Sequence, residues 1–493
     1  MPQLSYVHNF GTVAQASSYM MFGYDEIYDM RYMDVDYKGY WARNGKTIQQ
    51  AFAEFQESYD DIMTRCKAQD KIIYDDGLAS GNDKYAEVLC ASYRHCIAAH
   101  KIFEDKKGNL LFFSKENNSN GCVNTVDLTY PSAPLFLLYN TELMKGMCTS
   151  ILDYCESDRW GFNFAAHDLG TYPHANNQVY AIRFPDANGG FGGNMPIEES
   201  ANIVILAAAI SNAEGNTEWA NRYWKTLTTW TDYLVENGQD PENQLCTDDF
   251  AGHLAHNANL AVKAIMGVAG YALLCYQRGD TDAYAAYMAK AKEMAANWVT
   301  LAKDGIHYKL AYDRSGTWSQ KYNMVWDKAW KLELFPEQVK NQEYNYYLSK
   351  LNTYGLPLDS RSSYTKSDWE MWTAALARND NYFLRISDLV WKYVNETPSR
   401  VPLSDWYFTD GNGSMAAFRA RSVVGGHWMK VYVDKKLSGE IGTAIAPIQA
   451  QEETMFNAQC SMFNEGWYNL SGQRVKTPNQ HGIYIKDGKK VAK

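Results

Sequence analysis

Several features that mark other classes of protein are missing from this 493-residue sequence. No apolar run approaches the roughly 20 residues that span a bilayer, so we expect no membrane-spanning segment. The nine cysteines show no CxxC or other zinc-ligand spacing, and their odd number argues against a complete disulfide framework. P-loop, HExxH and GxSxG motifs are absent, and the first residues lack the basic and apolar regions of a signal peptide.

Basic residues are outnumbered by acidic ones. The chain carries 57 acidic and 47 basic side chains, a formal net charge of -10, and has no Lys/Arg stripe with interleaved aromatics. We therefore expect a small-molecule substrate rather than a nucleic acid partner. Aromatic residues, in contrast, are abundant, with 36 Tyr, 19 Phe and 15 Trp. Both a helix-packed core and a ligand-binding funnel use such residues.

Helix-length segments dominate the chain. In 217–237, apolar residues recur every three or four positions, whereas 203–210 and 260–276 are apolar almost all round. Alternation of one-sided and fully apolar helices predicts an outer and an inner ring, which is an all-α (α/α)6 toroid of six helical hairpins over 46–430. The twelve expected segments are 47–67, 82–104, 131–157, 197–212, 217–237, 254–277, 281–303, 322–334, 338–352, 366–378, 381–397 and 414–424.

The connectors between these segments alternate between short and long. The long ones precede the apolar helices, so we predict that they form a rim around one mouth of the toroid. The N-termini of the inner helices, with their partial positive charge, would face this mouth. They are 158–196, 238–253, 304–321, 353–365 and 398–413. The connector 105–130 breaks this alternation, and 109–114 within it is strand-like.

Both ends of the chain differ in composition from the helical body. Residues 1–45 are predicted to be an N-terminal segment, the remnant of a preceding domain or linker. Residues 431–460 are polar and predict a linker. Strand-like stretches and an Asp-Gly turn predict a small β-hairpin-like tail over 461–493.

Acidic residues gather at the predicted starts of inner helices, in the pairs Glu198-Glu199 and Asp248-Asp249. Helix capping explains much of this pattern, but acids on one rim can also place a general acid opposite a general base. We expect Glu199 and Asp249 to be the acid/base pair, because they open neighbouring inner helices. Glu198, Asp248 and Asp168 are the nearest alternatives.

Three further patterns allow competing interpretations. His167 and Asp168, in the longest rim loop, suit substrate binding or proton transfer, but equally a braced turn. Asp249, His253 and His256 share a helical spacing but lack a closed ligand set, so we expect neither a metal nor an organic cofactor. The sequence 363–366 matches S-x-x-K, a pattern short enough to arise by chance.

Several motif blocks resemble the glutaminase A family. They include SNGCVNTVDLTYPSAP at 119–134, FAAHDLGTYP at 164–173, MPIEES at 195–200 and LCTDDFAGHLAHN at 245–257, and the resemblance covers about 20–430. It implies a six-hairpin, glycosidase-like fold and hydrolysis of glutamine to glutamate and ammonia. Within this resemblance, the residues expected to contact substrate are Asp127, His167, Trp326, Asp327 and Arg361.

The resemblance leaves the reaction class open. Because the fold is shared with glycoside hydrolases, the alternative is an enzyme that uses the same carboxylates on an oligosaccharide. A third interpretation is a non-enzymatic binding or scaffold protein. The tail resembles those of exported Bacteroides-type proteins, so we expect a secreted, periplasmic or cell-surface location, although family members usually carry a signal peptide and β-rich domains before the toroid.

Overall fold

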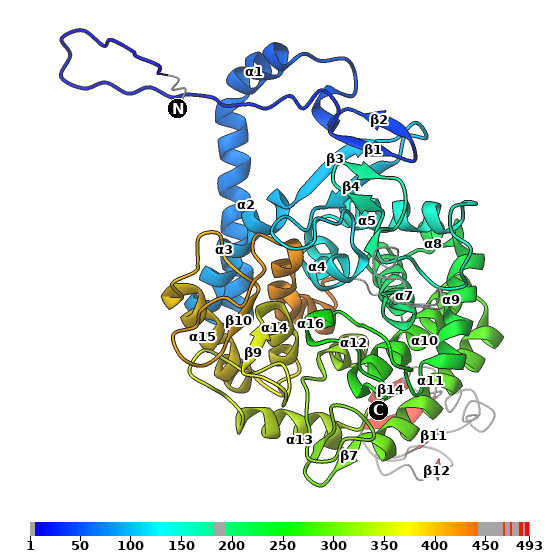
Figure 1. The fold of residues 1–493 in the computed structure, drawn as a ribbon. Helices are drawn as coiled ribbons and strands as arrows, with labels where there is room; N and C mark the ends of the chain where they lie inside the picture. Colours follow the sequence, from blue (N-terminus) through cyan, green and yellow to red (C-terminus); the bar gives the residue numbers. More distant parts are fainter. Residues whose placement is uncertain are drawn as a thin grey trace.

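The computed structural model describes residues 5–180 and 193–441, and the backbone of four short strands beyond them. Within the described residues, twelve helices form two concentric rings (Figure 1). The inner helices are α4 (Val126–Tyr139), α7 (Pro196–Glu214), α10 (Ala258–Arg278), α12 (Val325–Trp330), α14 (Ser367–Ala375) and α16 (Met429–Ser438). The outer helices are α3 (Asp83–Ala98), α5 (Thr141–Cys155), α9 (Trp224–Asn237), α11 (Thr281–Ala302), α13 (Glu337–Leu348) and α15 (Asp380–Glu396).

Both rings close on themselves. Outer helix α3 packs against α15, and α4 packs against the 3-10 helix η4 (Ser422–Trp428), which leads directly into α16. Gly425 and Gly426 permit this last contact, because an added Cβ would lie 2.6 Å from the Ser132 carbonyl and 2.7 Å from that of Pro131. The predicted (α/α)6 toroid is confirmed.

Burial follows the alternation seen in the sequence. In α7 all residues from Pro196 to Asn212 are buried, whereas α15 buries one stripe that includes Phe383, Ile386 and Val390. Among the described residues, α10 alone has the length and apolarity of a membrane span, and its qualifying window is entirely buried inside the protein. It is therefore accounted for as a core helix of the inner ring.

Two of the expected helical segments were wrong: one contains two helices of the rings, and the other lies outside the rings. The segment 131–157 is two helices, inner α4 and outer α5, because Asn140 breaks the helix and caps the next one through Leu143 N (3.3 Å). The segment 47–67 belongs to α1 (Ile48–Glu57) and α2 (Tyr59–Ser80). Helix α1 has no buried residue, and α2 buries only Ile73, Gly77 and Ser80, where it packs against α3; both lie outside the rings (Figure 1).

Smaller differences lie at the ends of other segments. Segment 82–104 ends as strand β3 (His100–Glu104), which pairs antiparallel with β4 (Leu110–Ser114), the strand expected at 109–114. Segments 217–237 and 322–334 begin with the separate short turns α8 (Glu218–Asn221) and η3 (Tyr322–Met324). The helix expected at 414–424 lies instead at η4 and α16, so the helical body extends to Ser438 rather than to residue 430.

Short strands support the rim. The N-terminal strand β1 (Met30–Tyr32) pairs with β2 (Val35–Tyr37) on one side and with β6 (His174–Ala175) on the other, and β6 pairs with β5 (Gly170–Thr171). The N-terminal segment thereby braces the loop that contains His167. Elsewhere β9 (Tyr364–Lys366) pairs with β10 (Trp406–Phe408), and β7 (Lys303–Asp304) with β8 (His307–Tyr308).

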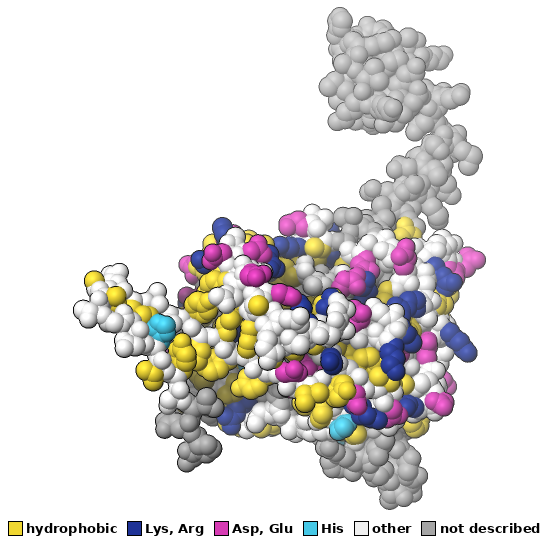
Figure 2. Space-filling model, turned by 90° about the horizontal axis from the view of Figure 1, so that it is seen from above, with side chains coloured by type: hydrophobic (Ala, Val, Ile, Leu, Met, Phe, Trp, Pro, Cys, Tyr) yellow, Lys and Arg dark blue, Asp and Glu magenta, His cyan; other side chains and the backbone are white. Residues whose placement is uncertain are grey.

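The tail beyond residue 460 contains four described strands in one antiparallel sheet, in the order β12-β11-β13-β14. They are β11 (Trp467–Tyr468), β12 (Arg474–Val475), β13 (Ile483–Lys486) and β14 (Lys489–Ala492). The expected Asp-Gly turn lies outside the described residues. On the face of the molecule shown in Figure 2, basic and acidic side chains are interspersed, without a basic stripe.

Candidate active site

A pocket lies at the mouth of the inner ring. Its walls come from five of the six segments that lead into inner helices, so the long connectors do share one face of the toroid. A wider depression adjoins it and shares Ser119, Asn120, Asp249 and Phe418. The residues that line the inner pocket are Glu116, Ser119, Asn120, Asp127, Leu128, His167, Thr247, Asp249, Lys366, Phe418 and Arg421.

A buried group that we call the acid–histidine cluster lies at one wall of the pocket: Asp127 and His167, which line it, and Glu199, which does not. Asp127 lies in the first turn of α4 and Glu199 in the first turn of α7. Asp127 Oδ1 is 3.7 Å from His167 Nε2, and one ligand atom from each of the three residues lies within 4.8 Å of the others. Three segments distant in sequence thus meet at one point.

Asp168 orients this histidine. Its carboxylate accepts backbone N–H bonds from Gly170 (2.8 Å), Val179 (3.1 Å) and Tyr180 (3.2 Å), and it lies 2.9 Å from His167 Nδ1. Because a carboxylate so placed accepts bonds, Nδ1 carries the proton and Nε2 faces Asp127. Asp168 does not line the pocket, so its place is behind His167.

The cluster has perturbed acidities. Burial raises the pKa of Asp127 to about 7, reinforced by the charges of Glu116 and Asp249 and opposed by His167. Burial also raises the pKa of Glu199 well above its ordinary value, as does the charge of Asp127. Burial alone would lower the pKa of His167, but the bond to Asp168 and the surrounding carboxylates raise it to about 10.

Of the carboxylates that line the pocket, Asp249 is the most exposed. It begins the short turn η2 (Asp249–Ala251), is half-buried, and lines both the pocket and the outer depression. The Tyr180 hydroxyl donates a hydrogen bond to it (2.5 Å). Glu199, which we expected to face it, is fully buried and does not line the pocket. The pocket-facing acid nearest to Glu199 is Asp127.

Glu198 is occupied by a structural ion pair. Its Oε1 accepts hydrogen bonds from the Lys263 ammonium and the Thr247 hydroxyl, and both charged side chains are almost fully buried. Lys263 Nζ also lies 4.2 Å from the centre of the Tyr130 ring. This pair ties the first turn of α7 to α10, beneath the pocket rather than in its wall.

Asp248 and Arg361 belong to the rim beside the pocket. Arg361 holds Asp359 through two bonds, Nε to Oδ1 (3.0 Å) and NH2 to Oδ2 (2.6 Å), and donates to the Ala251 carbonyl (3.3 Å). Burial raises the pKa of Asp248 to about 7, against the charges of Lys366 and Arg361. Neither Asp248 nor Arg361 is among the pocket-lining residues.

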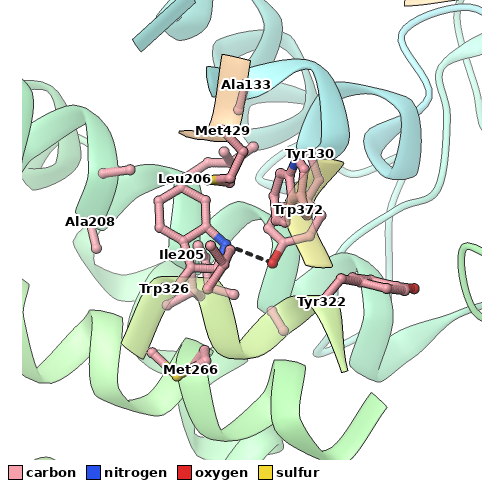
Figure 3. Close-up of a cluster of buried hydrophobic side chains, with 14 of the residues drawn as sticks. Tyr130, Ala133, Ile205, Leu206, Ala208, Met266, Tyr322, Trp326, Trp372 and Met429 are labelled. Atoms are coloured by element: carbon pink, nitrogen blue, oxygen red, sulfur yellow. Dashed lines mark hydrogen bonds between the residues drawn. The ribbon is translucent and has the colours of Figure 1, made fainter. Parts of the chain in front are cut away.

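Trp326 and Asp327 belong to the core. Trp326 is packed among inner helices, where its Nε1 donates to the Tyr130 hydroxyl at 2.8 Å (Figure 3). Asp327 accepts backbone bonds from Leu334 (2.8 Å) and Phe335 (3.4 Å) and pairs with Lys340 (3.1 Å). Neither side chain lines the pocket, so both have structural roles: Trp326 packs in the core and Asp327 caps a turn.

The pocket also contains two cationic residues that were not expected in it, Arg421 and Lys366, although Lys366 had appeared in the S-x-x-K pattern. Arg421 binds Asp405 at 3.2 and 2.6 Å and approaches Glu116 to 3.6 Å. Lys366 lies 3.2 Å from Asp368. Each precedes or opens an inner helix, which is the only sequence signal that would have indicated them.

Two patterns noted in the sequence do not form sites in the described structure. In 363–366 the serine immediately precedes strand β9 and the lysine is its last residue, so side chains three positions apart point to opposite faces. The helical spacing assumed for Asp249, His253 and His256 is wrong, because η2 ends at Ala251. His256 instead lies 2.7 Å from Asp240.

Residues 82–431 match the model of the glutaminase A six helical-hairpin domain. The chain belongs to the glutaminase A family. Residues 1–76 match a second model, a domain of unknown function named DUF5127. The family resemblance read from the motif blocks is therefore confirmed.

Two curated relatives are similar over most of this chain. Glutaminase A of Aspergillus oryzae is 32% identical over 395 residues, which is 78% of this chain and 55% of that protein. A probable glutaminase of Arthroderma benhamiae is 29% identical over 455 residues, 74% of this chain and 51% of that protein. The chain thus spans about half the length of these relatives.

Solved structures with similar folds are more distant. A wild-type glycosidase aligns with a TM-score of 0.47 at 12% identity, covering 72% of this chain and 97% of that one. A bacterial glucoamylase complexed with acarbose aligns with a TM-score of 0.47 at 8% identity, covering 72% of this chain and 56% of that one.

Proposed function

We propose that the pocket is a hydrolase site that converts L-glutamine to glutamate and ammonia. The observation that carries the proposal is a pocket wall with carboxylates, a histidine and two cationic side chains in one small space. Free glutamine is a zwitterion with a terminal amide, so it needs a cation for its carboxylate and an anion for its ammonium group. The two curated relatives that are named glutaminases support the same reaction.

The charges divide between recognition and chemistry. Arg421 and Lys366 supply positive charge for the substrate carboxylate, although both are partly neutralised by Asp405 and Asp368. Glu116 offers negative charge for the ammonium group from the same wall as Arg421. This leaves Asp127, backed by His167, and Asp249, bonded to Tyr180, for the reaction itself.

Amide hydrolysis needs an activated water and a proton for the departing nitrogen. We assign water activation to the wall that contains Asp127, and proton delivery to Asp249 with Tyr180. The water oxygen bonds to the amide carbon, the carbon–nitrogen bond breaks, and the proton lost by water reaches the nitrogen, which leaves as ammonia. Of the pair expected from the sequence, this assignment retains Asp249 and replaces Glu199 with Asp127, which lines the pocket.

One observation favours the alternative, hydrolysis of an oligosaccharide. Phe418 lines the pocket and its ring centre is 4.8 Å from that of Trp406, which in turn is 4.3 Å from that of Phe250. Aromatic faces of this kind bind the apolar faces of large ligands. A glycan would use the same carboxylates as acid and base.

The test is release of ammonia from L-glutamine by the purified chain, beside sugar release from a panel of glycans. Asp127→Asn and Asp249→Asn should each lower the rate of ammonia release by about 100-fold or more, because each removes a titratable group at constant volume. Asp240→Asn is the matched control, since this exposed acid pairs with His256 outside the pocket.

Three results would overturn the proposal. If folded Asp127→Asn and Asp249→Asn keep the parent rate of ammonia release, these residues are not the acid and base. If the parent chain releases sugar but no ammonia, the glycosidase alternative holds. If it releases neither, the binding-protein interpretation takes its place.

A further inference from the structure

We propose that the acid–histidine cluster binds a divalent transition-metal ion of the Zn²⁺ or Mn²⁺ type, contrary to the absence of a metal expected from the sequence. Asp127, His167 and Glu199 would supply one ligand atom each. Because Asp127 and His167 also line the pocket, a further coordination position would face the substrate. The metal's place in the reaction rests on the proposed function, but its binding does not.

The first support is a pair of buried carboxylate oxygens to which no described residue donates a hydrogen bond. Asp127 Oδ1 and Glu199 Oε1 receive no hydrogen bond, although Asp127 is only 5% exposed and Glu199 is fully buried. A buried carboxylate oxygen that receives no hydrogen bond from the protein is costly, so each of these oxygens is open to a ligand. Both atoms belong to the group whose ligand atoms lie within 4.8 Å of one another.

The second support is the way in which the ligands are held from behind. Asp168 binds His167 through Nδ1, which leaves Nε2 for the cluster. Asn202 Nδ2 donates to Glu199 Oε2 (3.0 Å), which leaves Oε1 for the cluster. Metal-binding histidines commonly donate their second N–H to a carboxylate, and such partners fix both the ring orientation and the protonated nitrogen.

The donor set favours one class of ion. One imidazole nitrogen and two carboxylate oxygens suit Zn²⁺ or Mn²⁺, whereas Ca²⁺ takes six to eight oxygen ligands. Two carboxylates also balance the charge of a divalent ion once the histidine is neutral. A proton on His167 is the competing occupant of the same space, because an imidazolium would neutralise one of the two carboxylates.

A bound ion would define how this wall activates water. The chemistry that such an ion would supply is water activation, because coordination lowers the pKa of water toward neutrality. The open coordination position would face the pocket, which Asp127 and His167 line. Asp249 would keep its role in proton delivery to the leaving nitrogen.

The test is metal binding by the full chain in the absence of substrate. Chain treated with a chelator and then dialysed should take up one Zn²⁺ or Mn²⁺ per molecule, measured by titration calorimetry and elemental analysis. Co²⁺ in the same site should give visible d–d absorption. Asp127→Asn and Glu199→Gln should each weaken binding by about 10-fold or more, because each removes a ligand oxygen.

His256→Gln is the matched control, since it removes an exposed histidine paired with Asp240 and should leave the stoichiometry and affinity unchanged. Circular dichroism of each variant confirms that loss of binding is not loss of fold. Absence of saturable one-to-one binding to the parent chain would overturn the proposal and leave the proton on His167 as the occupant. Binding that survives both cluster substitutions would also overturn it.

The two proposals fail separately. A chain that binds one ion through the cluster but releases no ammonia would refute the glutaminase assignment and leave the metal site standing. A chain that hydrolyses glutamine at full rate after chelation, without binding an ion, would refute the metal site alone.

Discussion

Replacement of Lys263 by Met tests whether Glu198 is a structural group or a reactive one. Lys263 and Glu198 are each about 1% exposed, and their charged atoms are in direct contact. Lys263→Met keeps the apolar stem of the side chain but removes the positive charge. Glu198 would then be a buried carboxylate whose remaining donors are Thr247 and Asn202 (3.4 Å).

The expected loss follows from that environment. Removal of one partner of a buried ion pair costs about 3–5 kcal/mol of unfolding free energy, because the other charge stays desolvated. Loss of the ammonium above the Tyr130 ring adds to this, by about 1 kcal/mol. In the double variant Glu198→Gln/Lys263→Met neither of these two positions carries a charge. We therefore expect the double variant to recover most of the lost unfolding free energy, with a coupling energy of about 2–4 kcal/mol.

The assay is urea unfolding of the parent chain, the two single variants and the double variant, followed by tryptophan fluorescence. Additive effects of the two substitutions, or a loss below about 1 kcal/mol in Lys263→Met, would refute this reasoning. Either result would mean that water reaches Glu198. Glu198 would then return as a candidate for the catalytic acid.

Two further predictions concern the frame around the pocket. Burial raises the pKa of Glu370 to about 8 from its ordinary 4.5, so its contribution to stability is present below pH 4.5 and is lost as the pH rises toward 8. In urea unfolding, the free energy of unfolding of Glu370→Gln relative to the parent chain should therefore be higher at pH 7.5 than at pH 5, by about 1 kcal/mol or more. The same pH dependence in both chains would contradict this. Gly426→Ala should lower the free energy of unfolding by about 1–3 kcal/mol, because its Cβ would meet the Pro131 carbonyl at 2.7 Å. Gly161→Ala, with open space around it, is the control, and equal melting temperatures for the two variants would refute the close-packing argument.

The candidate site shows where sequence reasoning stops. The first turn of α7 and the turn before α10 were identified as acidic; Asp249 of the second lines the pocket, whereas the two acids of the first do not. Within the pair Glu198-Glu199, however, sequence does not show which acid is paired. Glu198 binds Lys263, 65 positions later, whereas Glu199 meets Asp127 and His167 from two other segments. Those partners come together only when the ring closes.

The ring itself was largely determined by the sequence. Periodicity is a local property, so the fully apolar turns of α7 and α10 marked inner helices before any packing was known. The alternation of connector lengths likewise placed the rim on one face. Tertiary structure decided that 131–157 is a hairpin and that α1 and α2 lie outside the rings. It also decided which carboxylates are buried, paired or open, because pairing and desolvation depend on neighbours from distant segments, which no local pattern records.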